Sequence, residues 1–232
     1  MNINKAVVVL PTFNEFENIP LVLDRIKQVI DADILFVDDG STDGTLELIK
    51  NLVTVDSKIK ALFRSKKMGL GSAYRDAYSY ALNENYQYLI QCDADGSHEI
   101  EKIPEFIDAA AKGADLVIGS RYVKGGSVVG WAKSRELISR IGNLYSRITL
   151  GLRTKDNTAG FRLYNLNSLS KIDFHRATAN GYAFQVQMTY LFKDLNVVEV
   201  PIQFVERQFG KSKMTINVAI EALVKIPMLR LK

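Results

Sequence analysis

The amino-acid sequence predicts an α/β domain whose mostly parallel sheet is covered by helices on both faces. Short, nearly continuous apolar runs alternate with helical patterns through the first half of the chain, which is typical of parallel sheets. Each run ends in polar residues, as expected where strands reach a ligand crevice. The predicted strands are "AVVVL" (6–10), "DILFVDD" (33–39), "IKALF" (59–63), "YQYLIQCDAD" (86–95) and "ADLVIGS" (114–120).

Helical periodicity predicts helices between and after these strands. In the first half they span about 17–30, 43–53, 70–83 and 100–112. The second half continues with helices at about 134–150 and 181–193 and a strand, "VVEVPIQF" (197–204). No internal repeat or flexible linker interrupts the chain, so we predict one domain over residues 1–232 that changes character near residue 121.

Composition excludes several classes of protein. With 47% hydrophobic and 24% charged residues among 232, the chain is an ordinary globular protein rather than a disordered one. The net charge of +4 suits an anionic partner. One cysteine, Cys92, excludes an internal disulfide and fits a reducing compartment. No secretory signal is visible, and no apolar stretch approaches the roughly 20 residues of a membrane-spanning helix.

Four polar clusters follow the predicted strands. They are "PTFNE", "DDGSTDG", "DADGSH" and "GSRY". The carboxyl ends of parallel strands meet at one edge of a sheet, and ligands of open α/β sheets bind beyond that edge. The sequence therefore predicts a binding site assembled from these four clusters.

The third cluster holds two aspartates, Asp93 and Asp95, one residue apart. Side chains alternate along a strand, so we expect both carboxylates to point to the same side, with Ser97 next in the series and His98 after it. Two carboxylates suit Mg²⁺ or Mn²⁺, which share their other positions with water and phosphate. Zinc does not fit, because the two histidines and one cysteine do not cluster. The alternative interpretation is a simple Asp-Gly turn.

The second cluster offers three more carboxylates, on Asp38, Asp39 and Asp43. A carboxylate can accept a hydrogen bond from a ribose hydroxyl or a base N–H. The same segment also resembles a helix N-cap, with Ser41 or Thr42 as the capping residue. We predict that both roles operate and that Asp39 faces the ligand.

Basic residues follow the later elements. Arg121 ends the fifth strand, Arg135 lies on the helix after "GW", and Arg207 and Lys213 share a glycine-containing loop. The guanidinium of arginine presents planar donors suited to phosphate. The segment "RSKKMGLGSAYR" lacks the G-K-[ST] ending of a P-loop, which excludes that class of nucleotide site.

Seven motifs together resemble a known enzyme family. "VVVLPTFNE", "FVDDGSTDGT", "KMGLGSAY", "DADGSH", "GSRYVKGG", "NTAGFRLY" and "ERQFGKSKM" occur in order over nearly the whole chain. The series is similar to that of the dolichol-phosphate (polyprenol-phosphate) mannose synthases, which are inverting glycosyltransferases of the GT-A fold. Each motif alone is modest, whereas the ordered series is specific to this group.

The resemblance implies a Rossmann-like GT-A fold and transfer of mannose from GDP-mannose to the phosphate of a membrane polyprenol such as dolichyl phosphate, with Mg²⁺ or Mn²⁺. The implied donor-binding residues are Pro11, Phe13, Glu15, Asp39, Asp93, Ala94, Asp95, Arg207 and Lys213. The implied catalytic residues are Asp93, Asp95, Arg121, Arg135 and Ser139. The implied metal ligands are Asp93, Asp95 and Ser97.

Two residues depart from the family pattern. Phe13 stands where tyrosine is frequent, and Ser97 stands where some relatives have glutamine. The first loses a hydroxyl contact and the second shortens the reach to a metal. By the resemblance, residues about 1–120 form the nucleotide-sugar half, and residues about 121–232 form the acceptor and membrane-interface half.

A lipid acceptor implies contact with a membrane surface. The helix at 134–150 is basic on one side and carries an apolar stripe on the other. This helix and the C-terminal segment fit interfacial helices, although each of the two could instead pack on the core. We expect a cytoplasmic enzyme, peripheral on the cytoplasmic face of a membrane. Dependence on a membrane protein partner, or a truncated chain, remain open alternatives.

The sequence leaves two other functions open. The first keeps the fold and changes the substrates, with glucose or another sugar moving from a UDP-sugar to polyprenyl phosphate. The second is a nucleotide-sugar-binding module without turnover, against which the complete set of charged residues argues. Nucleic acid is not an expected partner, because the basic groups accompany carboxylates and no aromatic stacking platform is apparent.

Overall fold

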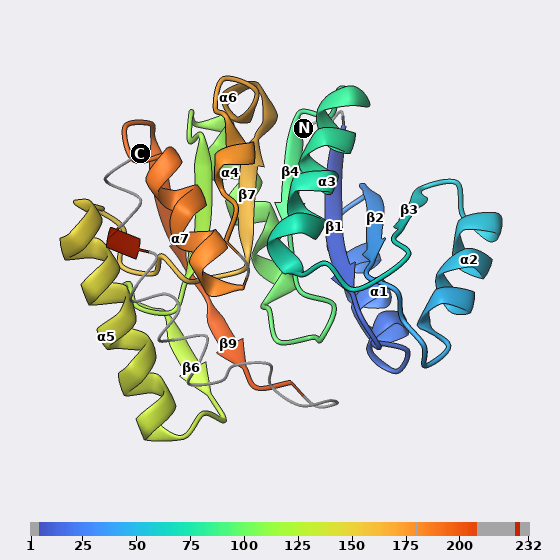
Figure 1. Ribbon diagram of the computed structural model, residues 1–232, viewed down its shortest axis with the longest axis horizontal. Helices are drawn as coiled ribbons and strands as arrows, with labels where there is room; N and C mark the ends of the chain where they lie inside the picture. The colour runs from blue at the N-terminus through green and yellow to red at the C-terminus, as the bar shows by residue number, and fades with distance from the viewer. Residues whose placement is uncertain (1–4, 180, 208–225, 228–232) are drawn as a thin grey trace.

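The computed structural model describes residues 5–179, 181–207 and 226–227, and within them a seven-stranded sheet lies between helices (Figure 1). The strand order is β3-β2-β1-β4-β7-β5-β8. The strands are β1 (Ala6–Thr12), β2 (Asp33–Asp38), β3 (Ile59–Phe63), β4 (Tyr88–Gln91), β5 (Leu116–Ser120), β7 (Arg162–Asn165) and β8 (Val197–Pro201). A second sheet pairs β6 (Ser127–Val129) with β9 (Gln203–Val205).

The strand directions confirm the predicted mostly parallel sheet. β1 pairs in parallel with β2 and β4, β2 with β3, and β5 with β8. β7 is antiparallel to both β4 and β5, so those two strands also run in one direction. The sequence reading missed β7 because its four residues, two of them polar, show no strand periodicity.

Each helix predicted from the sequence between residues 17 and 193 is present. The helices are α1 (Asn18–Val29), α2 (Thr45–Val55), α3 (Leu70–Asn83), α4 (Ile103–Ala111), α5 (Lys133–Leu150), α6 (Leu166–Leu169) and α7 (Tyr182–Leu191). Two short 3₁₀ turns, η1 (Ile100–Lys102) and η2 (Phe174–Arg176), complete the set. The short elements α6 and η2 fall below the length at which periodicity is visible.

Two hydrophobic cores cover the two faces of the sheet. Because strand side chains alternate, Val7 and Val9 of β1 face one core and Val8 and Leu10 face the other. The first core is completed by Tyr74, Ala77 and Tyr78 of α3 and by Phe184 and Met188 of α7. The second is completed by Ile19, Val22 and Ile26 of α1 and by Ile103 and Phe106 of α4. Both faces of the sheet are therefore buried, as the apolar strands predicted.

The end of β4 differs from the prediction. We expected the strand to run to Asp95, but it ends at Gln91 and the two aspartates lie in the following turn. Gly96 takes the left-handed conformation there, with φ 74°. The backbone N–H of Asp93 donates to His98 Nδ1 at 3.1 Å, which closes the turn. Strand alternation is therefore the wrong reason for the pairing of the aspartates.

The predicted N-cap of α2 is also wrong. Gly44 occupies the N-cap position in the left-handed conformation, and no side chain caps the helix. The Ser41 hydroxyl instead donates to Asp38 Oδ2 at 2.6 Å and accepts from the Asn14 backbone N–H at 2.9 Å. Ser41 thus joins the loops after β1 and β2, which is a tertiary contact that local capping rules do not describe.

Helix α5 presents an apolar stripe to solvent. Its exposed apolar residues are Leu137, Ile138, Ile141, Leu144 and Ile148, and each side chain is at least half exposed. The other side of its end packs through Leu150 against Leu152, Val186 of α7 and Ile226. Across the described residues, no helix combines the length and apolarity needed to span a membrane. The expected C-terminal interfacial helix falls mainly on residues 208–225 and 228–232, outside the described part.

Candidate active site

A cavity of about 430 Å³ lies beyond the carboxyl ends of the strands. The loops after β1, β2, β4 and β5 reach it, and β7, running the opposite way, begins there. The convergence predicted for the polar clusters is thus observed. Among the lining residues are Pro11, Phe13, Glu15, Asp39, Asp93, Ala94, Asp95, Ser97, Arg121, Arg135 and Arg207.

Among the described residues of the predicted site, only Ser139 is not one of those that line the cavity. The hydroxyl of Ser139, on α5, accepts a hydrogen bond from the Tyr122 phenol at 2.7 Å. Lys213 falls outside the described residues. The catalytic role of Ser139 and the donor contact of Lys213 stay predictions.

One end of the cavity is formed by the loops after β1 and β2. The Phe13 ring carries Lys67 Nζ 4.0 Å above its centroid, a cation–π contact. The Glu15 carboxylate accepts from Asn18 Nδ2 at 2.7 Å, at the start of α1. This contact joins the loop after β3, which carries Lys67, to the first polar cluster.

Asp39 is the one carboxylate of the second cluster that lines the cavity. Its oxygens accept from the backbone N–H groups of Met68 and Gly69, both at 2.9 Å, and Arg64 Nη1 lies 2.9 Å from Oδ1. A carboxylate has about four acceptor positions, so one remains for a ligand. Asp39 therefore shapes the 64–69 loop as well as facing the cavity.

Asp38 and Asp43, in contrast, serve the loops themselves. Asp38 accepts from the hydroxyls of Thr12 and Ser41, and Asp43 accepts from Thr45. These contacts explain the burial of Asp38, and burial otherwise penalises a carboxylate. The sequence left a contact with ribose or base open for Asp38 and Asp43. In the structure their carboxylates bind protein groups, and neither residue lines the cavity.

The centre of the cavity holds the aspartate pair. Asp95 is buried, its Oδ1 accepts from the Ser97 hydroxyl at 2.6 Å, and its Oδ2 lies 2.7 Å from Arg207 Nη2. Burial acts to raise the pKa of Asp95, but the Ser97 hydrogen bond and the Arg207 charge outweigh it and lower that pKa below its usual value. Asp95 therefore stays charged although it is buried, because a cation from the loop after β9 lies against it.

His98 supports Asp93 from behind. The imidazole is 2% exposed, and its Nδ1 accepts from the Asp93 backbone, so Nε2 carries the proton in the neutral ring. That Nε2 lies 3.7 Å from Asp93 Oδ2. Phe161 stacks on the imidazole with ring centroids 5.1 Å apart. These contacts orient the Asp93 side chain, which is 35% exposed toward the cavity.

The donor set of this turn fits a hard divalent cation. Asp93 and Asp95 supply carboxylate oxygens, which Mg²⁺ and Mn²⁺ prefer. Within the described residues, no group of three His, Cys, Asp or Glu side chains could hold a metal by itself. Further ligands must then come from water, from the Ser97 hydroxyl or from substrate phosphate, which is the usual arrangement for Mg²⁺ beside nucleotides.

A cationic and aromatic wall follows β5. Arg121 is buried and donates from Nε and Nη2 to Asp156, both at 2.7 Å, and its guanidinium lies 5.4 Å from the Trp131 ring. Burial acts to lower the pKa of Arg121, but the Asp156 charge and hydrogen bonds raise it further above its usual value. Arg135 lies 4.0 Å from the same ring and pairs with Glu206 at 2.6 Å.

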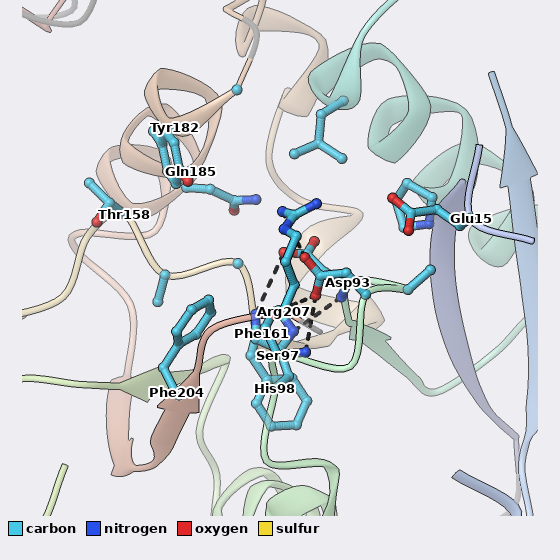
Figure 2. Close-up of a pocket in the computed structure, with 18 of the residues that line it drawn as sticks. Glu15, Asp93, Ser97, His98, Thr158, Phe161, Tyr182, Gln185, Phe204 and Arg207 are labelled. Carbon is cyan, nitrogen blue, oxygen red and sulfur yellow. Dashed lines mark hydrogen bonds and ion pairs between the residues drawn. The ribbon is translucent and has the colours of Figure 1, made fainter. Parts of the chain in front are cut away.

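Helix α7 contributes residues that the sequence reading missed. Tyr182 and Gln185 line the cavity from its first turn, and Thr158 lines it from the loop before β7 (Figure 2). Residues three apart share one face of a helix. The available signal was "GYAFQVQM", an apolar helix start that carries a tyrosine and a glutamine at that spacing.

Known protein sequences match nearly the whole chain. Residues 7–173 match the sequence profile described as "Glycosyl transferase family 2". The chain is 43% identical over 225 residues to the undecaprenyl-phosphate mannosyltransferase of Micrococcus luteus, covering 96% of this chain and 92% of that protein. It is 42% identical over 226 residues to the polyprenol monophosphomannose synthase of Mycolicibacterium smegmatis, covering 96% and 85%.

Solved structures match the fold at lower sequence identity. The glucosyl-3-phosphoglycerate synthase of Mycobacterium tuberculosis in complex with phosphoglyceric acid superposes with a TM-score of 0.69 and 19% identity, covering 97% of this chain and 79% of that one. The same synthase in complex with Mn²⁺, UDP-glucose and glycerol 3-phosphate gives 0.66 and 19%, covering 98% and 79%. At this identity the likeness concerns the fold alone.

Proposed function

This chain belongs to glycosyl transferase family 2, and from that premise we propose that it transfers mannose from GDP-mannose to the phosphate of a membrane polyprenol, with inversion at the sugar carbon. It has the GT-A fold expected from its sequence. The names of its relatives at 42% and 43% identity support mannose as the sugar and a polyprenol phosphate as the acceptor.

One observation carries the proposal. The cavity brings the pair Asp93 and Asp95 and the cation Arg207 together with a second cationic group, Arg121 and Arg135, on the wall beside Trp131. Two anionic groups can therefore be held near each other, a donor diphosphate and an acceptor phosphate. Their mutual repulsion is offset by the arginines.

The protein's own residues account for the main steps. Phe13, Glu15 and Asp39 would receive the nucleoside, and Arg207 would offset the charge that develops on the departing nucleoside diphosphate. An Mg²⁺ or Mn²⁺ ion on Asp93 and Asp95 would supply further positive charge to the diphosphate. Arg121 and Arg135 would orient the acceptor phosphate toward the sugar carbon.

The acceptor needs no strong general base. A phosphate monoester has a second pKa near 6 and is largely dianionic at neutral pH. It can attack the sugar carbon directly, so the cavity does not require a catalytic histidine. This matches the position of His98, which is 2% exposed behind Asp93 and engaged with it.

We place the lipid part of the acceptor on the α5 side of the cavity. Arg135 and Trp131 lie at the start of α5, and the exposed stripe of this helix follows them. An amphipathic helix with basic residues beside an apolar face suits the interface of an anionic membrane. We therefore propose peripheral attachment to the cytoplasmic face of a membrane. Residues about 1–120 would form the nucleotide-sugar half of the protein.

The test uses radiolabelled donors. The protein is incubated with GDP-mannose or UDP-glucose, polyprenyl phosphate and Mg²⁺, and the organic phase is extracted. We expect label in the lipid fraction from GDP-mannose and its loss when EDTA is added. Label from UDP-glucose alone would support glucosyl transfer instead, and no label from either donor would contradict the proposed reaction.

A further inference from the structure

Gln185 is a buried polar side chain without a partner. It is 2% exposed, and neither its Nε2 nor its Oε1 has a hydrogen-bond partner among the described residues. Leaving such groups unsatisfied is costly, so nearly all buried side-chain amides in folded proteins are hydrogen-bonded. The side chain lines the cavity and extends into it from α7 (Figure 2). A ligand bound in the cavity can supply the missing partners.

The backbone of Gln185 is held firmly. Its carbonyl accepts from Arg162 Nη1 and from the Thr189 hydroxyl, both at 3.0 Å. The same buried guanidinium binds the carbonyls of Asn157 and Ala159, at 2.8 Å each, in the loop that lines the cavity. Arg162 thus fixes α7 against that loop, so the amide is presented to the ligand in one position.

The position of Gln185 selects which part of a nucleotide-sugar it meets. Glu15 lies on one side of the cavity, after β1, Asp93 and Arg207 lie in the middle, and Gln185 lies on the opposite side (Figure 2). A donor extends from base to ribose to diphosphate to sugar. With its nucleoside on the first side and its diphosphate in the middle, the sugar reaches α7.

We propose that the Gln185 amide recognises the transferred sugar, donating from Nε2 to one hydroxyl and accepting at Oε1 from another. An amide offers both a donor and an acceptor, as a hydroxylated ring requires. A phosphate would be repelled by Oε1 and is better met by the nearby arginines. Gln185 is thus a specificity-determining residue of the donor site, an inference that rests on the proposed function.

The experiment compares nucleotide binding with and without the sugar. Calorimetric titration gives Kd for GDP and GDP-mannose, and for UDP and UDP-glucose, with Mg²⁺ present, in the wild type and in Gln185→Leu. GDP and UDP lack the sugar, so we expect their affinity to stay unchanged. In Gln185→Leu, the affinity for the nucleotide-sugar that the wild type binds should fall about tenfold relative to the affinity for the matching nucleoside diphosphate. A tenfold change is the equivalent of one neutral hydrogen bond.

Thermal unfolding separates recognition from a structural role. Leucine is one bond shorter than glutamine but has a similar volume, and it removes two unsatisfied buried atoms, so the Tm of Gln185→Leu should equal or exceed that of the wild type. Gln187→Leu is the matched control on the same helix. Its Oε1 accepts from the Ala179 N–H at 2.8 Å and it does not line the cavity, so its Tm should fall while the sugar preference is kept.

Each outcome is distinct. A lower Tm for Gln185→Leu with an unchanged sugar preference overturns the assignment and leaves the proposed reaction intact. If the wild type binds UDP-glucose but not GDP-mannose, the proposed donor is wrong. Loss of the preference for UDP-glucose over UDP in Gln185→Leu would then still support the assignment. A wild type that binds no nucleotide-sugar overturns the proposed function and this assignment together.

Discussion

Single side chains in the cavity are arranged so that each buried charge meets an opposite one. Arg207 neutralises Asp95, and Asp156 neutralises Arg121. An unpaired ion in such an environment costs several kcal/mol. The lowered pKa of Asp95 and the raised pKa of Arg121 keep these two buried groups charged at neutral pH, which suits a site for two phosphorylated substrates.

At the residue scale, Asp95→Asn tests the central carboxylate. Asparagine keeps the shape but removes the negative charge, so it weakens the hold on Arg207 and on a divalent cation. We expect sugar transfer to fall by about a hundredfold or more, measured with labelled donor and polyprenyl phosphate. Asp108→Asn, on the exposed side of α4, should keep full activity. Wild-type transfer by Asp95→Asn in the presence of EDTA would falsify the metal assignment.

Asp156→Asn tests the buried ion pair. Asp156 is 0% exposed and binds two nitrogens of Arg121, so its neutralisation leaves a buried cation uncompensated. We expect the free energy of unfolding to fall by about 3–5 kcal/mol, measured by urea denaturation. Asp31→Asn, which breaks an exposed pair with Lys58, should leave the free energy of unfolding nearly unchanged. Equal effects of the two changes would contradict the role of Asp156.

At the scale of the elements, helix α5 is unusual because it leaves its apolar face uncovered. A helix of a globular protein usually turns its apolar stripe toward the core. In α5, Ser139, Asn143 and Ser146 are buried whereas Leu144 and Ile148 are exposed. The buried polar residues are held by hydrogen bonds, such as that from Asn143 Nδ2 to Thr158 Oγ1 at 3.0 Å. The helix is thus anchored by polar contacts and presents its apolar face outward.

At the element scale, the variant Ile141→Asp/Ile148→Asp tests this face. Two carboxylates remove apolar area and repel anionic lipid, so we expect sedimentation with anionic vesicles to weaken about tenfold or more. Wild-type binding should also decline as salt rises, because salt screens the basic residues. Val55→Asp, which changes an even more exposed apolar residue on α2, should bind like the wild type. Unchanged binding by the double variant would show that the apolar face of α5 does not contact the membrane.

At the scale of the whole molecule, the cavity depends on how closely α3 and α7 approach. Gly71 of α3 lies against the Ala179 carbonyl and the Phe184 ring, and a Cβ there would come 2.3 Å from that oxygen. This contact joins the β1–β4 region to the segment that carries Tyr182 and Gln185. The spacing of the two cavity walls is therefore set by a glycine outside the cavity.

Gly71→Ala tests this packing. Alanine favours a helix over glycine by up to about 1 kcal/mol, but the clash with Ala179 should dominate and lower the free energy of unfolding by about 1–3 kcal/mol. Gly142→Ala in α5 is the matched control, since nothing lies within 4 Å of its added Cβ. That variant should gain stability. Denaturant titration of both should give opposite signs, and two stabilised variants would show that α3 and α7 can move apart.

Much of this molecule follows from local patterns in its sequence. The apolar runs and their periodicity predicted strands β1 to β5 and β8, the longer helices and the mostly parallel direction of the sheet, because burial on both faces imposes a regular spacing of apolar residues. The polar cluster after each strand placed Asp93, Asp95 and Arg121 at one edge. The ordered motifs identified the family.

Only the tertiary structure decided how these residues are paired and which others join them. Asp156 lies 35 residues from Arg121, and Glu206 lies 71 residues from Arg135. The insertion of β7 between β4 and β5, and the approach of Gln185 to the cavity, likewise depend on contacts between distant segments. Periodicity describes which face of an element is buried, but not which distant side chain meets it there. That choice is made by packing and charge compensation, which act only once the chain has folded.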